Sequence, residues 1–285
     1  MAGGPGWGVG AAGGVAATAL SAASPAGMAA SASALGSARV AAAIDSDAPA
    51  PAPLPVLHAD DALAIVDKPA GLMVHDSALA RGETDFAADR LREQFGRPVF
   101  LVHRLDRATS GCLLLAFDRD TASALGTLVM SRDVDKTYWA ICRGWPAEVE
   151  FTIDHPLDGG PGKPVKKPAI TRFTRLATTE IDAPSTGFAT SRYAWLQARP
   201  ETGRFRQIRR HLKHACHHLI GDTSHGDGRH NRTFRMLGIH RMLLHARALA
   251  FVHPRTGARI EACAPPDAEF ARALALFDGA PPPPP

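Results

Sequence analysis

The segment that most constrains the fold is a polar stretch enclosed by two apolar runs. Val99–Val102 and Cys112–Phe117 both have the composition of buried strands. Between them lie the nine residues His103–Gly111, which include two arginines and an aspartate. A polar loop held between two buried strands is typical of a functional site carried by a rigid sheet. We therefore expect the chain to build a sheet that presents this loop.

Other apolar patterns extend this sheet and add helices. The further predicted strands are Leu63–Val66, Tyr138–Ile141 and Tyr193–Leu196, and a hairpin turn is predicted at Pro254–Gly257. The predicted helices run toward Met130, with Asp120 as the capping residue, and from Phe205 to Ala215. Several strands with few helices predict an α+β fold on a mixed, mainly antiparallel sheet with flanking helices.

The sequence divides into one globular region and two tails. Residues 1–52 are rich in Ala, Gly, Ser and Pro, so they cannot bury enough apolar surface to offset chain entropy. We expect this segment to be disordered, and a start of translation at Met28 is the alternative. Residues 53–277 form the predicted globular domain, and residues 278–285 form a Pro-rich tail.

Composition limits the classes of binding partner that we expect. The 285 residues carry a formal net charge of +4, and their Lys and Arg side chains are concentrated in a few segments, which suits a polyanion such as RNA. A solvated basic face is the alternative on composition alone. No apolar run is long enough to span a bilayer, and the four cysteines are widely spaced. We therefore expect a cytoplasmic protein with free thiols that binds RNA and no membrane.

Asp106 is the first candidate for chemistry. It lies between Arg104 and Arg107, and nearby cations favour the ionised form of a carboxylate. An ionised aspartate that is partly removed from water can act as a nucleophile or a general base. A structural salt bridge is the alternative, and this short segment taken alone favours it.

Two further segments carry candidate residues. Tyr138 opens a predicted strand, where its phenol either faces a substrate or only packs. After the Glu201–Gly203 turn, the predicted helix and the residue before it are rich in cations, namely Arg204, Arg206, Arg209, Arg210 and Lys213. Free N–H groups at a helix N-terminus and arginine side chains both attract phosphate. This segment therefore predicts a phosphate-binding surface, with a solvated surface helix as the alternative.

The histidines of this segment raise the question of a metal ion. His211 and His214 are three residues apart on the predicted helix and could converge on one ion. However, the helix has no carboxylate at ligand spacing, and the sequence has no His-Glu-x-x-His pattern. We therefore expect no metal and assign these histidines to RNA contacts or to the core.

Five segments, taken in order, resemble the RluA-type pseudouridine synthase family. Val66–His75 is similar to the family's opening strand and loop, and His103–Gly111 to its catalytic motif. Lys136–Tyr138 resembles its tyrosine motif, Gly203–Leu212 its basic motif, and Gly221–Gly226 the segment that follows. One match would be weak evidence, whereas five in order over residues 54–277 are very specific.

The resemblance implies an activity and a role for each candidate. The family isomerises uridine to pseudouridine in RNA without a cofactor, after the base has been flipped out of its helix. Asp106 would attack the ribose or assist departure of the uracil, and Arg209 would hold Asp106 ionised. Tyr138 would abstract a ribose proton and pack against the uracil, and Arg104 would enter the vacated stack. The implied RNA contacts are Arg104, Arg107, Arg204, Arg206, Arg210 and Lys213.

Further similarities to particular members of the family indicate which RNA is the substrate. Arg143–Trp145, Asp154–Leu157 and His225–Arg232 are similar to segments of members that modify tRNA, which implies uridine 65 in the T stem. Ribosomal RNA is the alternative substrate, and a non-catalytic RNA-binding protein is the alternative from another class. A metal-dependent RNA hydrolase would need a carboxylate and histidine cluster that the sequence lacks. We expect the protein to act as a monomer.

Overall fold

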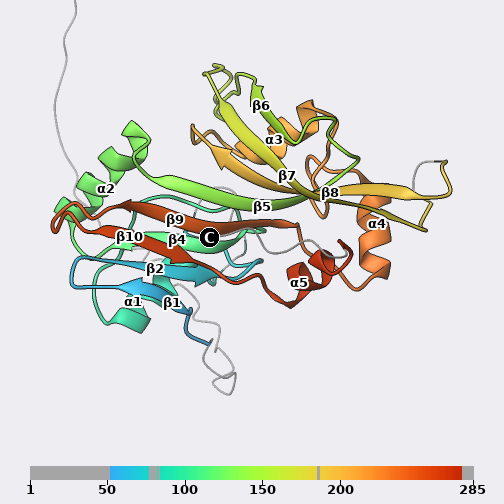
Figure 1. Cartoon of the computed structure of the whole chain (residues 1–285). Helices are drawn as coiled ribbons and strands as arrows, with labels where there is room; N and C mark the ends of the chain where they lie inside the picture. The colour runs from blue at the N-terminus through green and yellow to red at the C-terminus, as the bar shows by residue number, and fades with distance from the viewer. Residues whose placement is uncertain (1–51, 77–81, 83, 185–186, 278–285) are drawn as a thin grey trace, which may run out of the picture. The chain divides into compact units, whose positions relative to one another are not determined.

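The computed structural model describes residues 52–76, 82, 84–184 and 187–277 (Figure 1). Apart from Ala52, the two predicted tails, residues 1–52 and 278–285, lie outside the described residues. The strands are β1 (Val56–Ala59), β2 (Leu63–Lys68), β3 (Phe100–Leu101), β4 (Ser110–Ala116), β5 (Asp135–Arg143), β6 (Glu150–Asp154), β7 (Ile170–Ile181), β8 (Ser191–Pro200), β9 (Leu244–Val252) and β10 (Arg259–Cys263). The helices are α1 (Ala87–Phe95), α2 (Arg119–Ser131), α3 (Gln207–His214), α4 (Gly228–Met236) and α5 (Ala268–Leu274).

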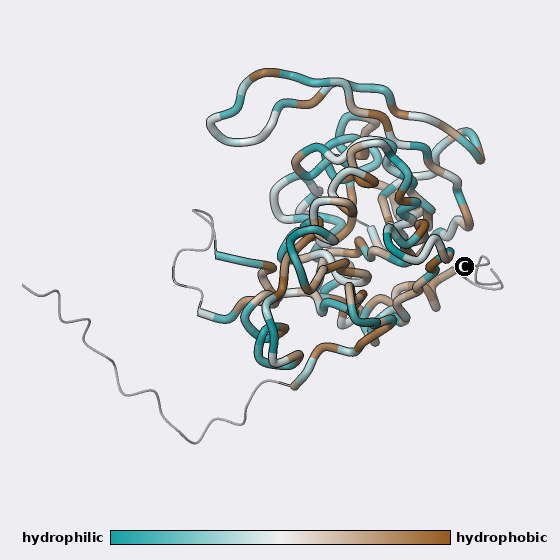
Figure 2. Tube along the Cα trace, turned by 90° about the vertical axis from the view of Figure 1, so that its left-hand side faces the viewer, coloured by the Kyte–Doolittle hydropathy of each residue, from teal (hydrophilic) through white to brown (hydrophobic). Residues whose placement is uncertain are grey.

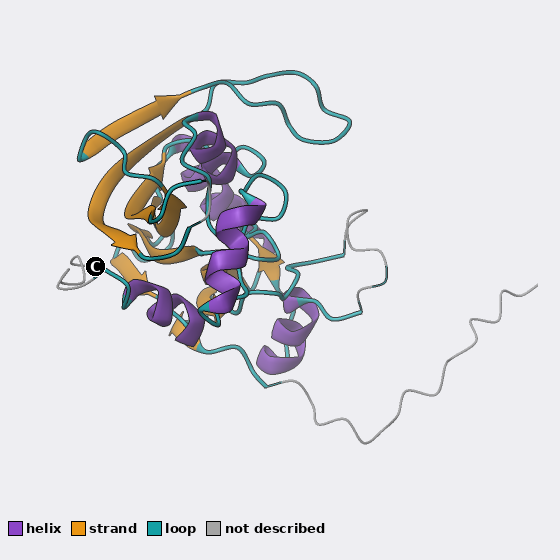
Figure 3. Ribbon diagram, turned by 90° about the vertical axis from the view of Figure 1, so that its right-hand side faces the viewer, coloured by secondary structure: helices purple, strands orange, loops and turns teal. Residues whose placement is uncertain are grey.

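All ten of these strands belong to one sheet. Its main order is β1-β2-β4-β9-β5-β8-β7-β6, with β3 paired to β4 and β10 paired to β9. Among the described strands every pairing is antiparallel except that of β4 with β9. The predicted α+β fold with a mixed, mainly antiparallel sheet and flanking helices is confirmed (Figure 3).

Both faces of the sheet are covered because its central strands are apolar on both sides. In β4, Leu113 and Leu115 pack with Leu91 of α1, whereas Cys112 and Leu114 pack on the opposite face in the cluster that contains α2. In Figure 2 hydrophobic residues are frequent in the inner part of the trace, and hydrophilic residues are frequent in the peripheral segments. β4 is therefore held by neighbouring strands at both of its edges and by side chains packed on both of its faces. It gives the segment preceding it a rigid support.

The same alternation places α3 on the face of α1. Ala140 and Cys142 of β5 pack in one cluster with Ile208 and Leu212 of α3. Tyr138, on the same side of β5, borders both this cluster and the α1 cluster. The opposite side of β5 packs against α4 and α5 through their phenylalanines. The basic helix predicted from the sequence therefore shares a face of the sheet with Tyr138.

Two predicted helix starts are wrong. The capping residue of α2 is Asp118 and not Asp120, because Asp118 is extended and its carboxylate accepts a hydrogen bond from the Thr121 N–H at 2.9 Å. The basic helix begins at Gln207 and not at Phe205. Arg206 has a φ of +51°, a left-handed conformation that interrupts the helix just after Phe205.

Candidate active site

The loop that carries Asp106 is anchored where β4 meets β9. Gly111 pairs with Ala246 across this parallel contact and has a φ of +106°. A Cβ at this position would lie 2.2 Å from the carbonyl oxygen of Ala246, so a side chain is excluded. Within the loop, the Thr109 N–H donates to the Asp106 carbonyl at 3.0 Å. The glycine that ends the polar segment thus lets β4 lie against β9 and fixes the exit of the loop.

Arg209 joins two carboxylates that are far apart in the sequence. Its Nη1 donates to Asp106 Oδ2 at 2.6 Å, while Nε and Nη2 donate to Oδ2 and Oδ1 of Asp222 at 2.6 and 2.8 Å. The side chains of Arg209 and Asp222 are 7% and 0% exposed, whereas that of Asp106 is 29% exposed. Asp106 therefore stands at the open end of a buried ionic chain.

Asp222 is the part of this chain to which sequence reasoning assigned no role. It follows Gly221, whose φ is +78° and whose Cβ position lies 2.0 Å from the carbonyl oxygen of Arg241. The Asp222 carboxylate also accepts hydrogen bonds from the N–H groups of Ser224 and His225. Burial opposes its ionisation, but the bonds from Arg209 and from these N–H groups outweigh burial and lower the pKa of Asp222. An aspartate in a glycine turn soon after a basic helix is the signal that could have revealed it.

The charge of Arg209 is secured by the same contacts. Burial alone would lower the pKa of Arg209, but the hydrogen bonds to Asp222 and Asp106 raise it. The guanidinium is therefore a permanent cation fixed against one oxygen of Asp106. Within the described part of the chain, no hydrogen bond to Asp106 Oδ1 is found, which leaves this oxygen available to an incoming group.

Tyr138 lies close to this carboxylate. The register pairs Tyr138 with Ala246 of β9, and Ala246 pairs in turn with Gly111 at the end of the Asp106 loop. The register shifts between Thr137 and Tyr138, where Arg247 of β9 is the extra residue. Burial, more than the neighbouring Cys112 and Asp106, raises the pKa of Tyr138, so the neutral phenol is the dominant form.

A buried lysine ties the Asp106 loop to the turn after β2. Lys68 is fully buried, and its Nζ donates to the carbonyl oxygens of Pro69 at 2.7 Å, Leu72 at 2.8 Å and Arg107 at 3.3 Å. Burial, followed by the nearby Arg241, lowers the pKa of Lys68 to about 7. The sequence segment Lys68–Gly71 predicted only a turn, whereas the structure shows a contact that positions the site.

The predicted RNA contacts fall into two groups. Arg104, Arg107 and Lys213 are exposed, and the guanidinium of Arg104 has no partner among the residues that the structure describes. The remaining three, Arg204, Arg206 and Arg210, are half-buried. Arg204 donates to the Pro168 carbonyl oxygen at 3.0 Å. Arg210 donates to the carboxylate of Asp158 at 2.7 Å, so it is held by the protein. Arg206 places its guanidinium 4.8 Å from the centre of the Phe205 ring.

The two histidines of the helix do not converge. His211 is fully buried and hydrogen-bonded to the Thr171 hydroxyl at 3.0 Å and to the His155 carbonyl oxygen at 3.1 Å. His214 instead stacks on the ring of His155, with the ring centres 3.7 Å apart. Among the described residues, no group of three or more His, Cys, Asp or Glu side chains could hold a metal ion. His211 is therefore a core residue.

Sequence reasoning also missed a basic loop beside this helix. The connection between β6 and β7 carries three exposed lysines, Lys163, Lys166 and Lys167. The loop is held against the helix segment by Asp158, which pairs with Arg210, and by the contact of Gly160 with Phe205. Three lysines among glycines and prolines were the available signal. Together with Lys213 they extend the cationic surface around α3.

The fold and the buried ionic chain from Asp222 through Arg209 to Asp106 agree with the class of protein that a family comparison shows. Residues 62–214, more than half of the chain, match the family model described as RNA pseudouridylate synthase, and the chain belongs to that family. It is therefore an isomerase that converts uridine in RNA to pseudouridine. The RluA-type resemblance inferred from the five sequence segments is confirmed.

Individual proteins that are similar to this chain have more specific names. The chain is 41% identical over 211 residues to tRNA pseudouridine synthase C of Vibrio cholerae, which covers 70% of this chain and 86% of that protein. It is 39% identical over 233 residues to tRNA pseudouridine synthase C of Pasteurella multocida, covering 78% of this chain and 96% of that one. Among solved structures, Human RNA Pseudouridylate Synthase Domain Containing 1 is 25% identical with a TM-score of 0.60, over 79% of this chain and 87% of that chain. No helix among the described residues is long and apolar enough to cross a membrane.

Proposed function

We propose that this protein converts uridine 65 in the T stem of tRNA to pseudouridine, with Asp106 as the nucleophile. The observation that carries the proposal is the contact of 2.6 Å between Arg209 and Asp106 at the open end of a buried ionic chain. Arg209 holds a permanent cation against one oxygen of Asp106 and leaves the other oxygen open. The relatives named for tRNA, about 40% identical over most of their length, support tRNA as the substrate.

The reaction requires that one glycosidic bond break and another form. The target base lies in a helical stem and must be flipped into the site, and we propose that Arg104, which is exposed, enters the vacated stack. The C1′–N1 bond then breaks, either because Asp106 Oδ1 attacks C1′ of the ribose or because Asp106 stabilises the positive charge left there. The detached uracil turns, its C5 bonds to C1′ and displaces Asp106 where that had bonded, and the proton lost from C5 is balanced by one taken up at N1. The isomerisation has no net redox change and no hydrolysis, so we propose that it needs no cofactor.

Tyr138 is proposed to pack against the uracil and to abstract a ribose proton. Because burial raises the pKa of Tyr138, this role requires that the phenol first give its proton to solvent and that the ribose proton be returned when the C5–C1′ bond forms. Phosphates of the stem are proposed to contact Arg107, Arg204, Arg206 and Lys213. Arg210 is already bound to Asp158, so we assign it to holding the β6–β7 loop as well as to RNA contact. We further propose a cytoplasmic monomer.

The substrate is tested with defined RNAs. An unmodified tRNA transcript is incubated with the protein beside the same transcript carrying cytidine at position 65 and a ribosomal RNA fragment of equal length. We expect pseudouridine at position 65 of the first transcript and none in the other two. Modification of the ribosomal fragment alone would replace tRNA by the alternative substrate. RNA binding without any pseudouridine would favour a non-catalytic RNA-binding protein.

A further inference from the structure

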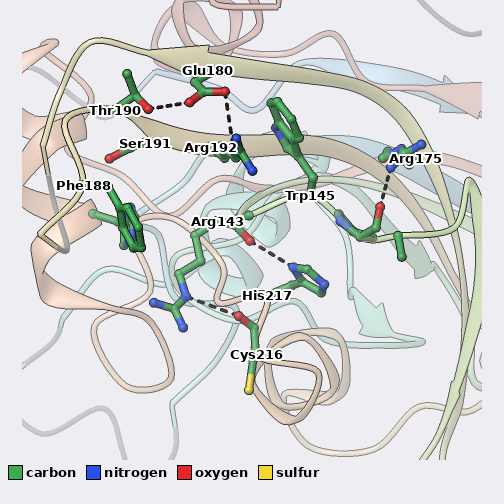
Figure 4. Close-up of a pocket in the computed structure, with 14 residues that line it drawn as sticks. Arg143, Trp145, Arg175, Glu180, Phe188, Thr190, Ser191, Arg192, Cys216 and His217 are labelled. Atoms are coloured by element: carbon green, nitrogen blue, oxygen red, sulfur yellow. Dashed lines mark hydrogen bonds and ion pairs between the residues drawn. The ribbon is translucent and has the colours of Figure 1, made fainter.

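A cavity opens beyond the C-terminal end of α3 (Figure 4). It has a volume of about 700 Å³ and is formed by the β5–β6 turn, the β7–β8 hairpin, the residues after α3 and one residue of α4. None of the lining residues belongs to the site around Asp106. Among them are Arg143, Trp145, Glu180, Phe188, Arg192 and Cys216.

The cavity is cationic. Arg143, Arg175 and Arg192 line it, whereas Glu180 is its one carboxylate, so the lining carries a formal charge of about +2. Arg143 donates to the Cys216 carbonyl oxygen at 3.2 Å and to Asp227 at 2.9 Å. These contacts fix the arginine at the cavity wall and leave its side chain 26% exposed. A fixed and partly exposed guanidinium suits a phosphate.

The cavity also presents two aromatic rings. Trp145 is 37% exposed and Phe188 is 73% exposed, and both belong to the few large apolar side chains left in water in the described chain. The Arg192 guanidinium lies 4.4 Å from the centre of the Trp145 ring and donates to Glu180 at 3.1 Å. Exposed rings beside arginines are the arrangement on which unpaired bases stack in proteins that bind single-stranded nucleic acid.

The cavity lies at an end of the sheet, where Arg192 comes from the face of α3 and Arg143 from the face of α4. Arg192 precedes Ala194 by two residues on β8, and Ala194 packs in the cluster with Ile208 and Leu212 of α3. The two sites are linked by α3, because Arg209 belongs to this helix and Cys216 follows its end.

We propose that this cavity is a second RNA-binding site that takes one unstacked nucleotide of the RNA whose uridine occupies the active site. Its base stacks on Trp145 and Phe188, and its phosphate contacts Arg143 and Arg192. The inference rests on the proposed function, because the charge and the aromatic rings select a nucleotide but the active site supplies the RNA. The site contributes affinity and no chemistry.

The first experiment measures RNA affinity and catalysis separately. Phe188→Ala and Arg192→Ala are compared with wild type by filter binding to unmodified tRNA and by single-turnover rates at saturating RNA. Met130→Ala is the matched control, because Met130 is 85% exposed on α2, which packs on the opposite face of the sheet. We expect Kd to rise roughly tenfold for Phe188→Ala, as is typical of one lost stacking contact, with unchanged saturated rates.

Phe188 is suited to this test because its exposed side chain can be truncated without unfolding the protein. Trp145→Ala serves as a second variant, checked by its melting temperature because Trp145 also donates to the Thr179 carbonyl oxygen at 3.1 Å. Kd values within twofold of the Met130→Ala control would overturn the inference, provided that wild type binds and modifies the RNA. If wild type neither binds nor modifies RNA, the proposed function fails instead.

A second experiment needs no substitution. Cys216 is an exposed thiol at the cavity, whereas Cys112 and Cys142 are buried and Cys263 is half-buried. The rate of Cys216 alkylation by iodoacetamide is followed by peptide mass spectrometry with saturating tRNA, with 5 mM uridine monophosphate, or with neither. We expect tRNA to slow Cys216 at least fivefold while Cys263 changes little. Equal rates of Cys216 alkylation with and without tRNA would overturn the assignment. So would protection of Cys216 by uridine monophosphate but not by tRNA.

Discussion

Removal of the Arg209 guanidinium should destabilise the fold as well as the site. In Arg209→Ala, the carboxylate of Asp222, which is fully buried, loses its bidentate partner and keeps only the hydrogen bonds from Ser224 and His225. Breaking a buried ion pair by removing one partner costs about 3–5 kcal/mol. For a domain of this size, 1 kcal/mol corresponds to a shift of about 2–4 °C. We therefore expect the melting temperature at pH 7 to fall by roughly 6–20 °C.

The pH dependence of this loss follows from Asp222. Its pKa is lowered in the folded protein, so its contribution to stability is present above the pKa of an unfolded aspartate and is lost as the pH falls through the folded value. The difference between wild type and Arg209→Ala should therefore be largest near pH 7 and should shrink toward pH 4, where the unpaired carboxyl takes up a proton. Calorimetry of both proteins at pH 4, 5.5 and 7 measures it.

A double variant separates folding from catalysis. Arg209→Ala/Asp222→Asn lacks the unpaired buried charge, so it should regain part of the lost melting temperature without regaining single-turnover activity. The reasoning is refuted if Arg209→Ala melts within 2 °C of wild type at pH 7, or if its deficit does not depend on pH. Recovery of activity in the double variant would show that Arg209 acts only through stability.

Three further outcomes are expected. Tyr138→Phe should keep RNA affinity and lower the single-turnover rate about 10²-fold or more, as loss of acid–base catalysis does; a rate within tenfold of wild type would limit Tyr138 to packing. Lys213→Ala should weaken tRNA binding and lower its salt slope by about one with little change in the saturated rate, and an unchanged slope would exclude a phosphate contact. Burial lowers the pKa of Lys68 to about 7, so between pH 7 and pH 9 the folded protein gives up a proton that the unfolded chain keeps. The free energy of unfolding of wild type should therefore rise relative to Lys68→Met by roughly 1–2 kcal/mol over this range in urea titrations, and parallel curves would show that Lys68 stays protonated on its three carbonyl contacts.

The strands next to the active site were predictable because nearly all of their residues are apolar. β2 and β4 are continuous apolar runs, so burial on both faces follows from the residues alone. β7 was missed because its exposed and buried positions alternate irregularly around a bulge near Arg175. The same holds for the start of α3, where the backbone of Arg206 and not the apolar spacing sets the boundary. Local backbone geometry of this kind has no signature in hydrophobic periodicity.

Only some residues of the candidate site could be predicted, because the sequence does not show which distant residues the fold brings together. Asp106, Tyr138 and Arg209 stand in segments whose residue types suggest chemistry. Asp222 and Lys68 acquire their importance from partners 13 and 39 residues away, to which only the fold brings them close. The same limit hid the cavity between Arg143 and Arg192, because its aromatic and basic side chains come from separate turns.

The central claim, that Asp106 is the nucleophile, is tested most directly by Asp106→Asn. This variant keeps the shape of the side chain and an oxygen for Arg209 but removes the negative charge. Single-turnover conversion of uridine 65 in saturating unmodified tRNA is measured together with Kd. The account predicts a rate at least 10³-fold below wild type with Kd within about threefold. Conversion within tenfold of wild type at equal RNA occupancy would contradict it.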